Sequence, residues 1–135
     1  MSITEGGIEA EKKARILLKS HGWQIQQADW IGRKDNKWLV FEIKQRELFK
    51  PPPFTGTGLD KTQIFLRNLL LKDLGLRTML IVFEKDTENI YCQYLDVLEK
   101  GKHFDTKNKI RIYPIKNFKH ISSSSIVEGA KYGSQ

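Results

Sequence analysis

The strongest chemical signal lies between Trp38 and Lys44, where one acid and one lysine interrupt an apolar run. Strand side chains alternate between two faces, so Glu42 and Lys44 point to the same side. Opposite charges on one face of a mostly buried strand are costly unless they pair, bind a metal or take part in chemistry. The Glu-x-Lys spacing therefore predicts one half of a metal-dependent nuclease site. A salt bridge at a sheet edge is the alternative.

A second acid, Asp29, ends the extended segment that precedes this strand. A short hairpin turning at Asp35 and Asn36 would bring Asp29 alongside Glu42. Two neighbouring carboxylates are hard oxygen ligands of the kind that Mg²⁺ prefers, and the ion would polarise a phosphate and activate a water. Lys44 could then hold that water or stabilise the charge that develops on the phosphate. Alternatively, Asp29 is a polar strand end, and Asp35 is ordinary turn chemistry.

The first predicted helix offers a third acid. On a helical wheel Glu11 lies about 50° from the centre of the apolar face, whereas Glu9 lies nearly opposite that centre. Glu11 is therefore expected to lean toward the sheet, where it could reach a metal ion or its water. The alternative is a partly exposed charge at the rim of the apolar face.

The second predicted helix adds two polar candidates near its start. Gln63 could position the attacking water or contact the phosphate, although Asp60-x-x-Gln63 also fits a capping box. Arg67 follows one turn later on the same face and could bind the DNA backbone.

The elements that would position these residues follow from periodicity and turn signals. We expect a helix over 5–21 ended by Gly22, an extended segment over 23–31, a strand over 38–44, a long loop over 45–59, a helix over 60–74 capped by Asp60 and Gly75, and strands over 78–84, 90–95 and 110–115. The continuous apolar run over 78–84 predicts a central strand buried on both faces. Leu39, Phe41 and Ile43 are expected in the core. The order predicts a mixed α/β sandwich around a sheet.

The composition fits one soluble domain. The chain has 135 residues, of which 39% are hydrophobic and 29% charged, with a net charge of +7 that favours a polyanionic partner. The single cysteine, Cys92, excludes an internal disulfide and a cysteine-based zinc site. No membrane span or signal peptide is visible, which predicts a cytoplasmic protein. We expect one nuclease domain over 1–121 and a flexible tail over 122–135.

Together, these residues resemble a known family. Gly7-x-x-x-Glu11, then Asp29, then Glu42-x-Lys44 is similar to the motif of the PD-(D/E)XK nuclease superfamily. Within it, the chain resembles the small Holliday-junction resolvases over residues 5–100. Segment 11–23 and the spacing from Asp29 to Glu42 look like the archaeal members, and segment 41–63 looks like the RecU-like bacterial members. Ala28 stands where the family usually has proline.

The resemblance implies a restriction-endonuclease-like core of order αβββαβ, with a mixed central sheet flanked by helices. It implies Glu11, Asp29 and Glu42 as metal ligands, Lys44 as the catalytic lysine and Gln63 as a supporting residue. It also implies Mg²⁺ as cofactor, with Mn²⁺ able to replace it, and a homodimer. The expected function is a metal-dependent endonuclease hydrolysing DNA phosphodiester bonds, above all a resolvase of four-way junctions in recombination and repair.

Phosphate contacts are expected from side chains that flank the site. The candidates are Arg33, Lys34, Arg46, Lys50, Thr55, Thr57, Lys61 and Arg67. For any one basic residue the alternative is a solvated surface charge, and the segment Thr55-Gly56-Thr57-Gly58 could be only a mobile hinge. Two other functions stay open: an endonuclease of the same superfamily acting on duplex DNA in restriction, repair or a mobile element, and a DNA-binding module that no longer cleaves.

Overall fold

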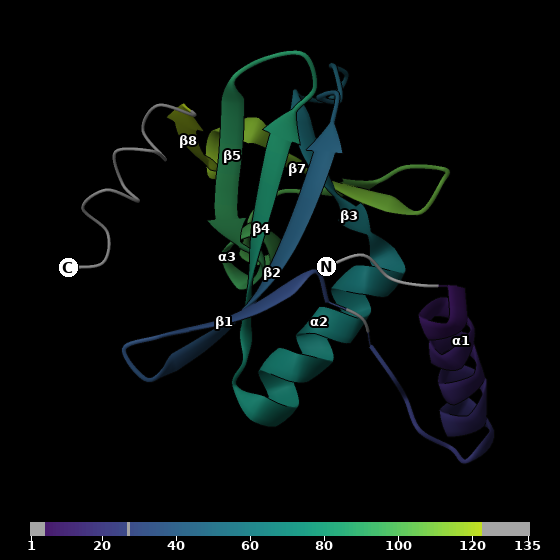
Figure 1. Ribbon diagram of the computed structural model, residues 1–135. Coiled ribbons are helices and arrows are strands. Elements are labelled where there is room, and N and C mark those ends of the chain that lie inside the picture. Colours follow the sequence, from purple (N-terminus) through teal and green to yellow (C-terminus); the bar gives the residue numbers. More distant parts are fainter. Residues whose placement is uncertain (1–4, 27, 123–135) are drawn as a thin grey trace.

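The computed structural model describes residues 5–26 and 28–122, which fold into two sheets with associated helices (Figure 1). The elements are α1 (Glu5–Ser20), β1 (Trp30–Lys34), β2 (Lys37–Arg46), β3 (Gly56–Asp60), α2 (Lys61–Leu74), β4 (Arg77–Glu84), β5 (Asn89–Tyr94), α3 (Leu95–Lys100), β6 (Phe104–Asp105), β7 (Ile110–Pro114), the 3-10 helix η1 (Ile115–Asn117) and β8 (Lys119–Ser122). Residues 123–135, nearly all of the predicted tail, lie outside the described residues.

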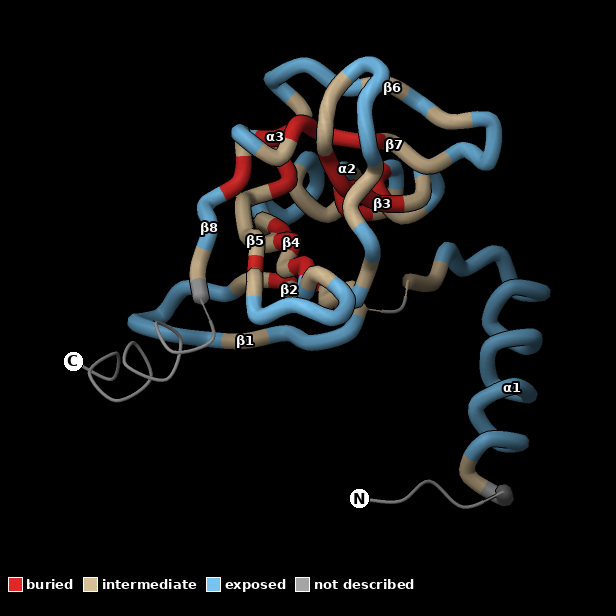
Figure 2. Tube along the Cα trace, turned by 90° about the horizontal axis from the view of Figure 1, so that it is seen from above, coloured by how far each residue is buried: buried red, intermediate tan, exposed pale blue. Residues whose placement is uncertain are grey.

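The central sheet is mixed, in the order β1-β2-β4-β5-β8. Only β2 and β4 run parallel, and the other neighbours are antiparallel. A parallel pair needs a long crossover connection, which the segment containing β3 and α2 supplies. Figures 1 and 2 show α2, α3 and the second sheet on one side of the central sheet. The predicted class, a mixed α/β fold with a mixed central sheet flanked by helices, is confirmed.

The predicted hairpin forms between β1 and β2. Asp35 and Asn36 have φ values of 52° and 63°, as expected for a two-residue turn that matches the twist of its strands. The register pairs Trp30 with Phe41, so the next step along β1 brings Asp29 level with Glu42. Of the predicted extended segment over 23–31, only Trp30 and Ile31 lie in a strand, because β1 begins at Trp30.

The second sheet has the order β3-β7-β6 and corrects the predicted loop over 45–59. The last part of that segment is β3, which pairs antiparallel with β7. At Gly56 and Gly58 a Cβ atom would collide with carbonyl oxygens of β7, so only glycine allows this approach. Gly56, Thr57 and Gly58 therefore lie in a strand rather than in the predicted loop.

The helix α2 has the predicted caps. The Asp60 carboxylate accepts a hydrogen bond from the Thr62 amide, and Gly75 ends the helix in the left-handed conformation with φ 67°. The buried residues of α2 are Ile64 and Arg67. One face of the helix therefore inserts both an aliphatic and a charged side chain into the interior.

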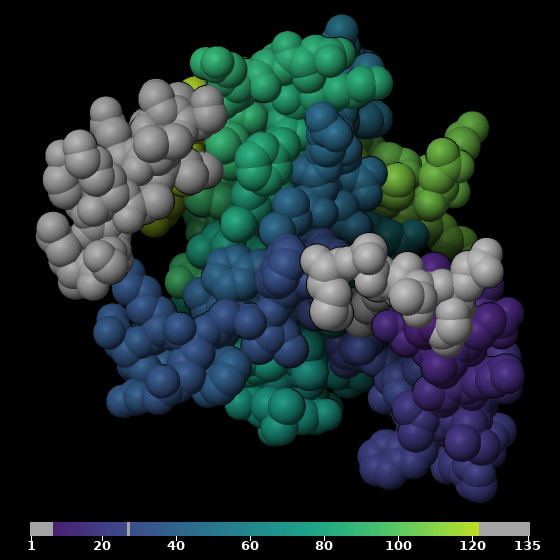
Figure 3. Space-filling model, in the orientation of Figure 1, coloured from purple at the N-terminus to yellow at the C-terminus, as the bar shows by residue number. Residues whose placement is uncertain are grey.

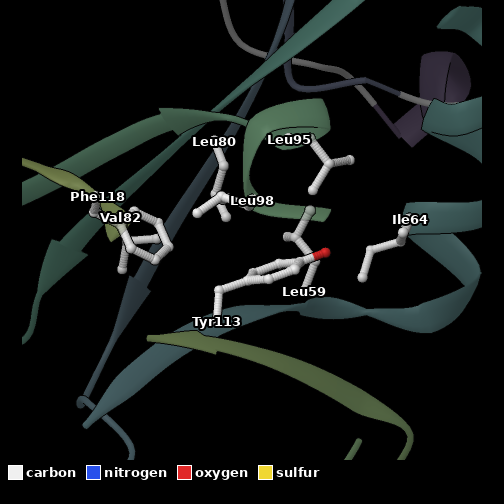
Figure 4. Close-up of a cluster of buried hydrophobic side chains, with 8 residues drawn as sticks. All are labelled: Leu59, Ile64, Leu80, Val82, Leu95, Leu98, Tyr113 and Phe118. Atoms are coloured by element: carbon white, nitrogen blue, oxygen red, sulfur yellow. The ribbon is translucent and has the colours of Figure 1, made fainter. Parts of the chain in front are cut away.

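The main core lies between the two sheets. Figure 4 shows side chains from β3, α2, β4, α3, β7 and the segment before β8 meeting there, and these are Leu59, Ile64, Leu80, Val82, Leu95, Leu98, Tyr113 and Phe118. Tyr113 is fully buried at the centre of the group. Burial of this kind stabilises a fold by roughly 1.5–3 kcal/mol per large apolar side chain.

The predicted burial of the central strands is wrong in one respect. In β4 the alternate residues Thr78, Leu80 and Val82 are buried, but Met79 is half-buried and Phe83 exposed. The strand is thus buried on one face only, because the covering elements all lie on one side of the sheet.

The same asymmetry reverses the two faces predicted for β2. Val40 and Glu42 are buried, whereas Leu39, Phe41 and Ile43 are only half-buried. The face expected to carry the core is therefore the more open one, and Glu42 lies on the side that faces α2.

Helix α1 stands apart from this body. Every residue from Ile8 to Ser20 is exposed, and Figures 2 and 3 show the helix as a separate lobe beside the sheets. Its apolar residues include Ile16 and Leu17, which are 70% and 58% exposed. Among the described residues, no helix is long and apolar enough to cross a membrane.

Candidate active site

The centre of the candidate site is a buried ion pair between β2 and α2. Glu42 is 1% exposed and Arg67 is 2% exposed. Arg67 Nε donates to Glu42 Oε1 at 2.7 Å, and a second guanidinium nitrogen lies 2.5 Å from the same oxygen. A buried carboxylate needs such a partner, because an unpaired charge in the interior is strongly unfavourable. This contact corrects the expectation that Arg67 binds the DNA backbone.

Gln26 extends the pair toward the segment after α1. Its Oε1 accepts a hydrogen bond of 2.5 Å from Arg67 Nη1. The Arg67 guanidinium is therefore hydrogen-bonded to both Glu42 and Gln26, which fixes its orientation relative to Glu42. The spacing of Arg67, three positions after Ile64, is a sequence signal for the buried face of α2. Gln26 lies in an irregular segment and carries no comparable signal.

Asp29 lies beside the same stretch of β2. Its Oδ2 accepts a hydrogen bond of 2.8 Å from the backbone amide of Ile43, the residue between Glu42 and Lys44. Among the described residues its other carboxylate oxygen, Oδ1, takes no hydrogen bond, and the side chain is exposed. Asp29 is thus anchored by one oxygen and open to solvent with the other.

Lys44 follows Glu42 on the same face of β2 and is half-buried. A strand advances about 3.3 Å per residue, so the two residues are about 7 Å apart along the strand. The arrangement therefore brings one anchored carboxylate, one ion-paired carboxylate and one ammonium group to a single stretch of β2.

Glu11 is the sequence candidate that the structure leaves apart. It lines a groove of about 490 Å³ together with Leu18, Ile25 and Gln26. Because Gln26 also bonds Arg67, this groove leads from α1 toward the buried ion pair. Glu11 is exposed in this groove, and the expected approach of Glu11 to the sheet is not seen.

The predicted magnesium site of Glu11, Asp29 and Glu42 is therefore not assembled. The described part of the chain contains no group of three or more His, Cys, Asp or Glu side chains placed to hold a metal ion. Glu42 already receives two contacts from Arg67, and Glu11 is on a helix that does not pack against β2. The residues present do not fit a complete ligand set, since Mg²⁺ requires several oxygen ligands in near-octahedral geometry.

The remaining site candidates divide between surface and interior. Gln63 is half-buried in the first turn of α2. Arg33, Lys34 and Lys50 are exposed, and Arg33 donates to Asn36 across the hairpin turn. Lys61 is exposed and lies 3.2 Å from Asp105. These positions leave the basic hairpin and the loop after β2 accessible to a large polyanion.

The other three candidates lie at the end of β2, just before β3 and on β3. Thr55 is half-buried, and its carbonyl oxygen accepts from the Ile115 amide at 2.8 Å. Thr57 is 2% exposed on β3, and Arg46 is half-buried at the end of β2. Arg46 and Thr57 both line a cavity of about 320 Å³ between β2 and the second sheet.

Comparisons with known proteins find a likeness of structure but no match to a family model or to a curated protein. The solved structure of Hjc from Archaeoglobus fulgidus, described as a Holliday junction resolvase from an archaeal hyperthermophile, aligns over 92% of this chain and 97% of its own, with 10% sequence identity and a TM-score of 0.46. A likeness at this level does not identify the function of the chain.

Proposed function

We propose that this protein is a nuclease that hydrolyses phosphodiester bonds of DNA at the site formed by β1, β2 and α2. The observation that carries the proposal is the hydrogen bond from the Ile43 amide to Asp29, because it holds an open carboxylate between Glu42 and Lys44. Acids and a lysine brought together at one strand provide groups that can handle a proton and a developing negative charge.

In this proposal the exposed groups act on the phosphate. Asp29 Oδ1 accepts a hydrogen bond from the attacking water and orients it toward phosphorus. As the water attacks phosphorus, Asp29 takes its proton, the bond from phosphorus to the leaving oxygen breaks, and that oxygen takes a proton from solvent. Lys44 stabilises the negative charge that grows on the phosphate oxygens. Anchoring of Asp29 by the Ile43 amide limits the rotation of its carboxylate, so the water is positioned in advance.

Glu42 and Arg67 support these groups from the interior. The ion pair holds α2 against β2, and it fixes the strand that carries both Lys44 and the amide that anchors Asp29. Gln63, in the first turn of α2, is proposed to contact the phosphate or its water. The proposal includes Mg²⁺, with Mn²⁺ able to replace it, as cofactor, but no step is assigned to an ion because the described ligand set is incomplete.

The favoured substrate is a four-way junction, and the favoured assembly is a homodimer. Exposed apolar side chains on α1, such as Ile16, and on the hairpin, such as Trp30 and Trp38, offer two separate surfaces that a second copy could cover. Two sites in a symmetric dimer would cut two strands of one junction. Arg33, Lys34 and Lys50 are proposed to hold its backbone phosphates, because all three are exposed.

The test is a cleavage assay on a four-way junction and on a linear duplex of matched sequence, with Mg²⁺, with Mn²⁺ and with a chelator. Asp29→Asn and Lys44→Met are each expected to lower the cleavage rate at least 100-fold, because Asp29 positions the attacking water and Lys44 stabilises the developing charge. Asp35→Asn is the matched control, because Asp35 is an exposed acid at the turn of the same hairpin and Asn tolerates its positive φ.

The outcomes separate the parts of the proposal. Symmetric nicks in the junction that disappear in Asp29→Asn support a resolvase. Equal cutting of linear duplex overturns junction selectivity and leaves a general nuclease. Equal loss of cleavage in Asp35→Asn contradicts the site.

A second candidate is a DNA-binding module without cleavage, and one observation favours it. Glu42 is buried in an ion pair with Arg67. In the described part of the chain the three predicted metal ligands, Glu11, Asp29 and Glu42, do not form a metal-binding group. Tight junction binding with no cleavage under any metal condition would establish this function and overturn the nuclease proposal.

A further inference from the structure

The cavity between the end of β2 and the second sheet has polar groups that the fold leaves unused. We call it the Arg46 pocket, and its walls include Arg46, Phe49, Thr57, Asn108 and Ile112, with a volume of about 320 Å³. Such a volume lies at the lower end of the range for small-ligand sites. The pocket is distinct from the Glu42–Arg67 pair, which does not line it.

Two buried donors beside this pocket have no hydrogen-bond partner in the described part of the chain. They are Arg46 Nε and the Thr57 hydroxyl. Buried polar groups in folded proteins are nearly always hydrogen-bonded, so each exception calls for an explanation such as an absent ligand or water. Thr57 is 2% exposed, so its hydroxyl is held in the wall rather than displayed on the surface.

The chemistry of these donors favours an oxyanion. A guanidinium group donates several hydrogen bonds in a fixed plane and matches phosphate oxygens well, and a hydroxyl can donate to a further oxygen. The Glu47 carboxylate also lines the pocket. A nearby acid disfavours a doubly charged free phosphate more than a phosphodiester, which carries a single charge. Phe49 and Ile112 offer an apolar wall suited to the sugar or base of a nucleotide.

The place of Arg46 on β2 connects the pocket with the proposed reaction site. Glu42, Lys44 and Arg46 alternate along one face of the strand, so Arg46 is about 7 Å beyond Lys44. We propose that the Arg46 pocket binds a backbone phosphate of the DNA strand that is cleaved, next to the phosphate at Lys44. This inference rests on the proposed nuclease function for the source of the phosphate, whereas the pocket itself rests on its own geometry.

The glycines of β3 are not the reason for this assignment. Gly56 and Gly58 are required by their close approach to β7. The ligand-binding groups are instead the side chains of Arg46 and Thr57.

The test uses two threonines with the same defect. Thr57 and Thr78 both have a buried hydroxyl without a partner, but only Thr57 lines the pocket. Thr57→Val and Thr78→Val are each expected to raise the melting temperature, because each replaces an unsatisfied hydroxyl with a methyl group. Only Thr57→Val is expected to weaken phosphate binding, by about tenfold, as for the loss of one hydrogen bond to a charged group.

Binding is measured by NMR titration of the full chain with inorganic phosphate and with a short single-stranded oligonucleotide. We expect saturable shifts of the Arg46 side-chain N–H and of β3 amides, with tighter binding of the oligonucleotide, and loss of both in Arg46→Gln. Equal weakening in Thr57→Val and Thr78→Val, or unchanged binding in Thr57→Val, overturns the inference. Saturation by phosphate with no shift from the oligonucleotide overturns the assignment to a DNA strand.

Cleavage is scored separately, so the two proposals fail in different ways. If the oligonucleotide binds in the pocket but no DNA is cleaved, the nuclease proposal is overturned and the proposal of phosphate binding in the Arg46 pocket is supported. If the wild type cleaves DNA and KM is unchanged in Arg46→Gln and Thr57→Val, the nuclease proposal is supported and the proposal of phosphate binding in the Arg46 pocket is overturned. A KM raised about tenfold in Thr57→Val, with kcat retained, supports both.

Discussion

Two glutamate–arginine pairs in this small protein solve the problem of a buried acid in different ways. Glu42 and Arg67 are almost fully buried, and both contacts from Arg67 fall on one oxygen, Oε1. Glu99 and Arg111 are 19% and 21% exposed. In that pair Arg111 Nη1 contacts both Glu99 oxygens, at 2.9 and 3.0 Å.

The Glu99 pair belongs to a saturated network. The Tyr113 hydroxyl donates to Glu99 Oε2 at 2.8 Å, and Arg111 also binds Asp105. Burial raises the pKa of the Glu99 carboxyl, but the hydrogen bonds from Tyr113 and Arg111, together with the charge of Arg111, outweigh it and hold the pKa below its ordinary value. Burial and the hydrogen bond to Glu99 raise the pKa of Tyr113. Glu99 is thus a fixed anion that ties α3 to β7.

The Glu42 pair leaves capacity unused. Among the described residues, no hydrogen bond reaches Glu42 Oε2. Asp29 nearby is likewise engaged through one oxygen. The two pairs therefore differ in how completely the acid is bonded: both oxygens of Glu99 have partners, whereas Glu42 is held through one oxygen.

The largest effect expected from this comparison is the loss of Arg67. Arg67→Met leaves the Glu42 charge buried and unpaired, which should lower the free energy of unfolding by about 3–5 kcal/mol. Arg111→Met should cost only about 1–3 kcal/mol, because Glu99 keeps Tyr113 and access to water. Urea unfolding measures both. The double variant Glu42→Leu/Arg67→Met should recover most of the free energy of unfolding that Arg67→Met loses. The comparison between the two pairs fails if Arg111→Met destabilises the protein as much as Arg67→Met does.

An intermediate effect is expected from Glu99 as pH falls. Because its folded pKa lies below the ordinary value of 4.5, the unfolded chain takes up the proton first. The stabilisation is fully present above that value and is lost as pH falls through the folded pKa. Glu99→Gln should therefore be less stable at neutral pH and show a flatter decline in acid. Urea titrations of both proteins across this range check it, and parallel curves would contradict the assigned role.

The smallest effect is expected at the rim of the Glu99 network. Lys61 and Asp105 are 3.2 Å apart and 45% and 34% exposed. Lys61→Met should change stability by no more than about 1 kcal/mol, and the difference should shrink further in high salt. Thermal unfolding at low and high ionic strength measures this, and a loss that persists in high salt would mean that the contact is stronger than its exposure suggests.

Local chemistry made part of this molecule predictable. The Asp-Asn turn predicts the hairpin that carries Asp29 to Glu42, and the caps at Asp60 and Gly75 predict both ends of α2. These features depend on a few neighbouring residues. They could therefore be read without knowing which elements pack together.

The features that were missed depend on distant packing. Strand β3 contains two glycines, which disfavour strands. It forms because β7 approaches β3 so closely that a side chain at either glycine would collide with it. The predicted buried face of β2 is the wrong one, because apolar alternation does not reveal on which side α2 and the second sheet lie. The sequence alone predicts a DNA contact for Arg67, because its ion-pair partner, Glu42, is distant in sequence. Whether the candidate residues act in catalysis stays a prediction.

The exposure of α1 has a consequence for how the molecule opens. A helix of 16 residues is near the length at which an isolated helix in water is only marginally formed. Without burial to hold it, α1 should exchange its amide hydrogens through local fraying, whereas β4 exchanges only when the whole body unfolds. The chain would then melt in two steps, with a loss of helical signal that precedes the loss of the sheets. Any partner that covers α1 would merge those steps into one.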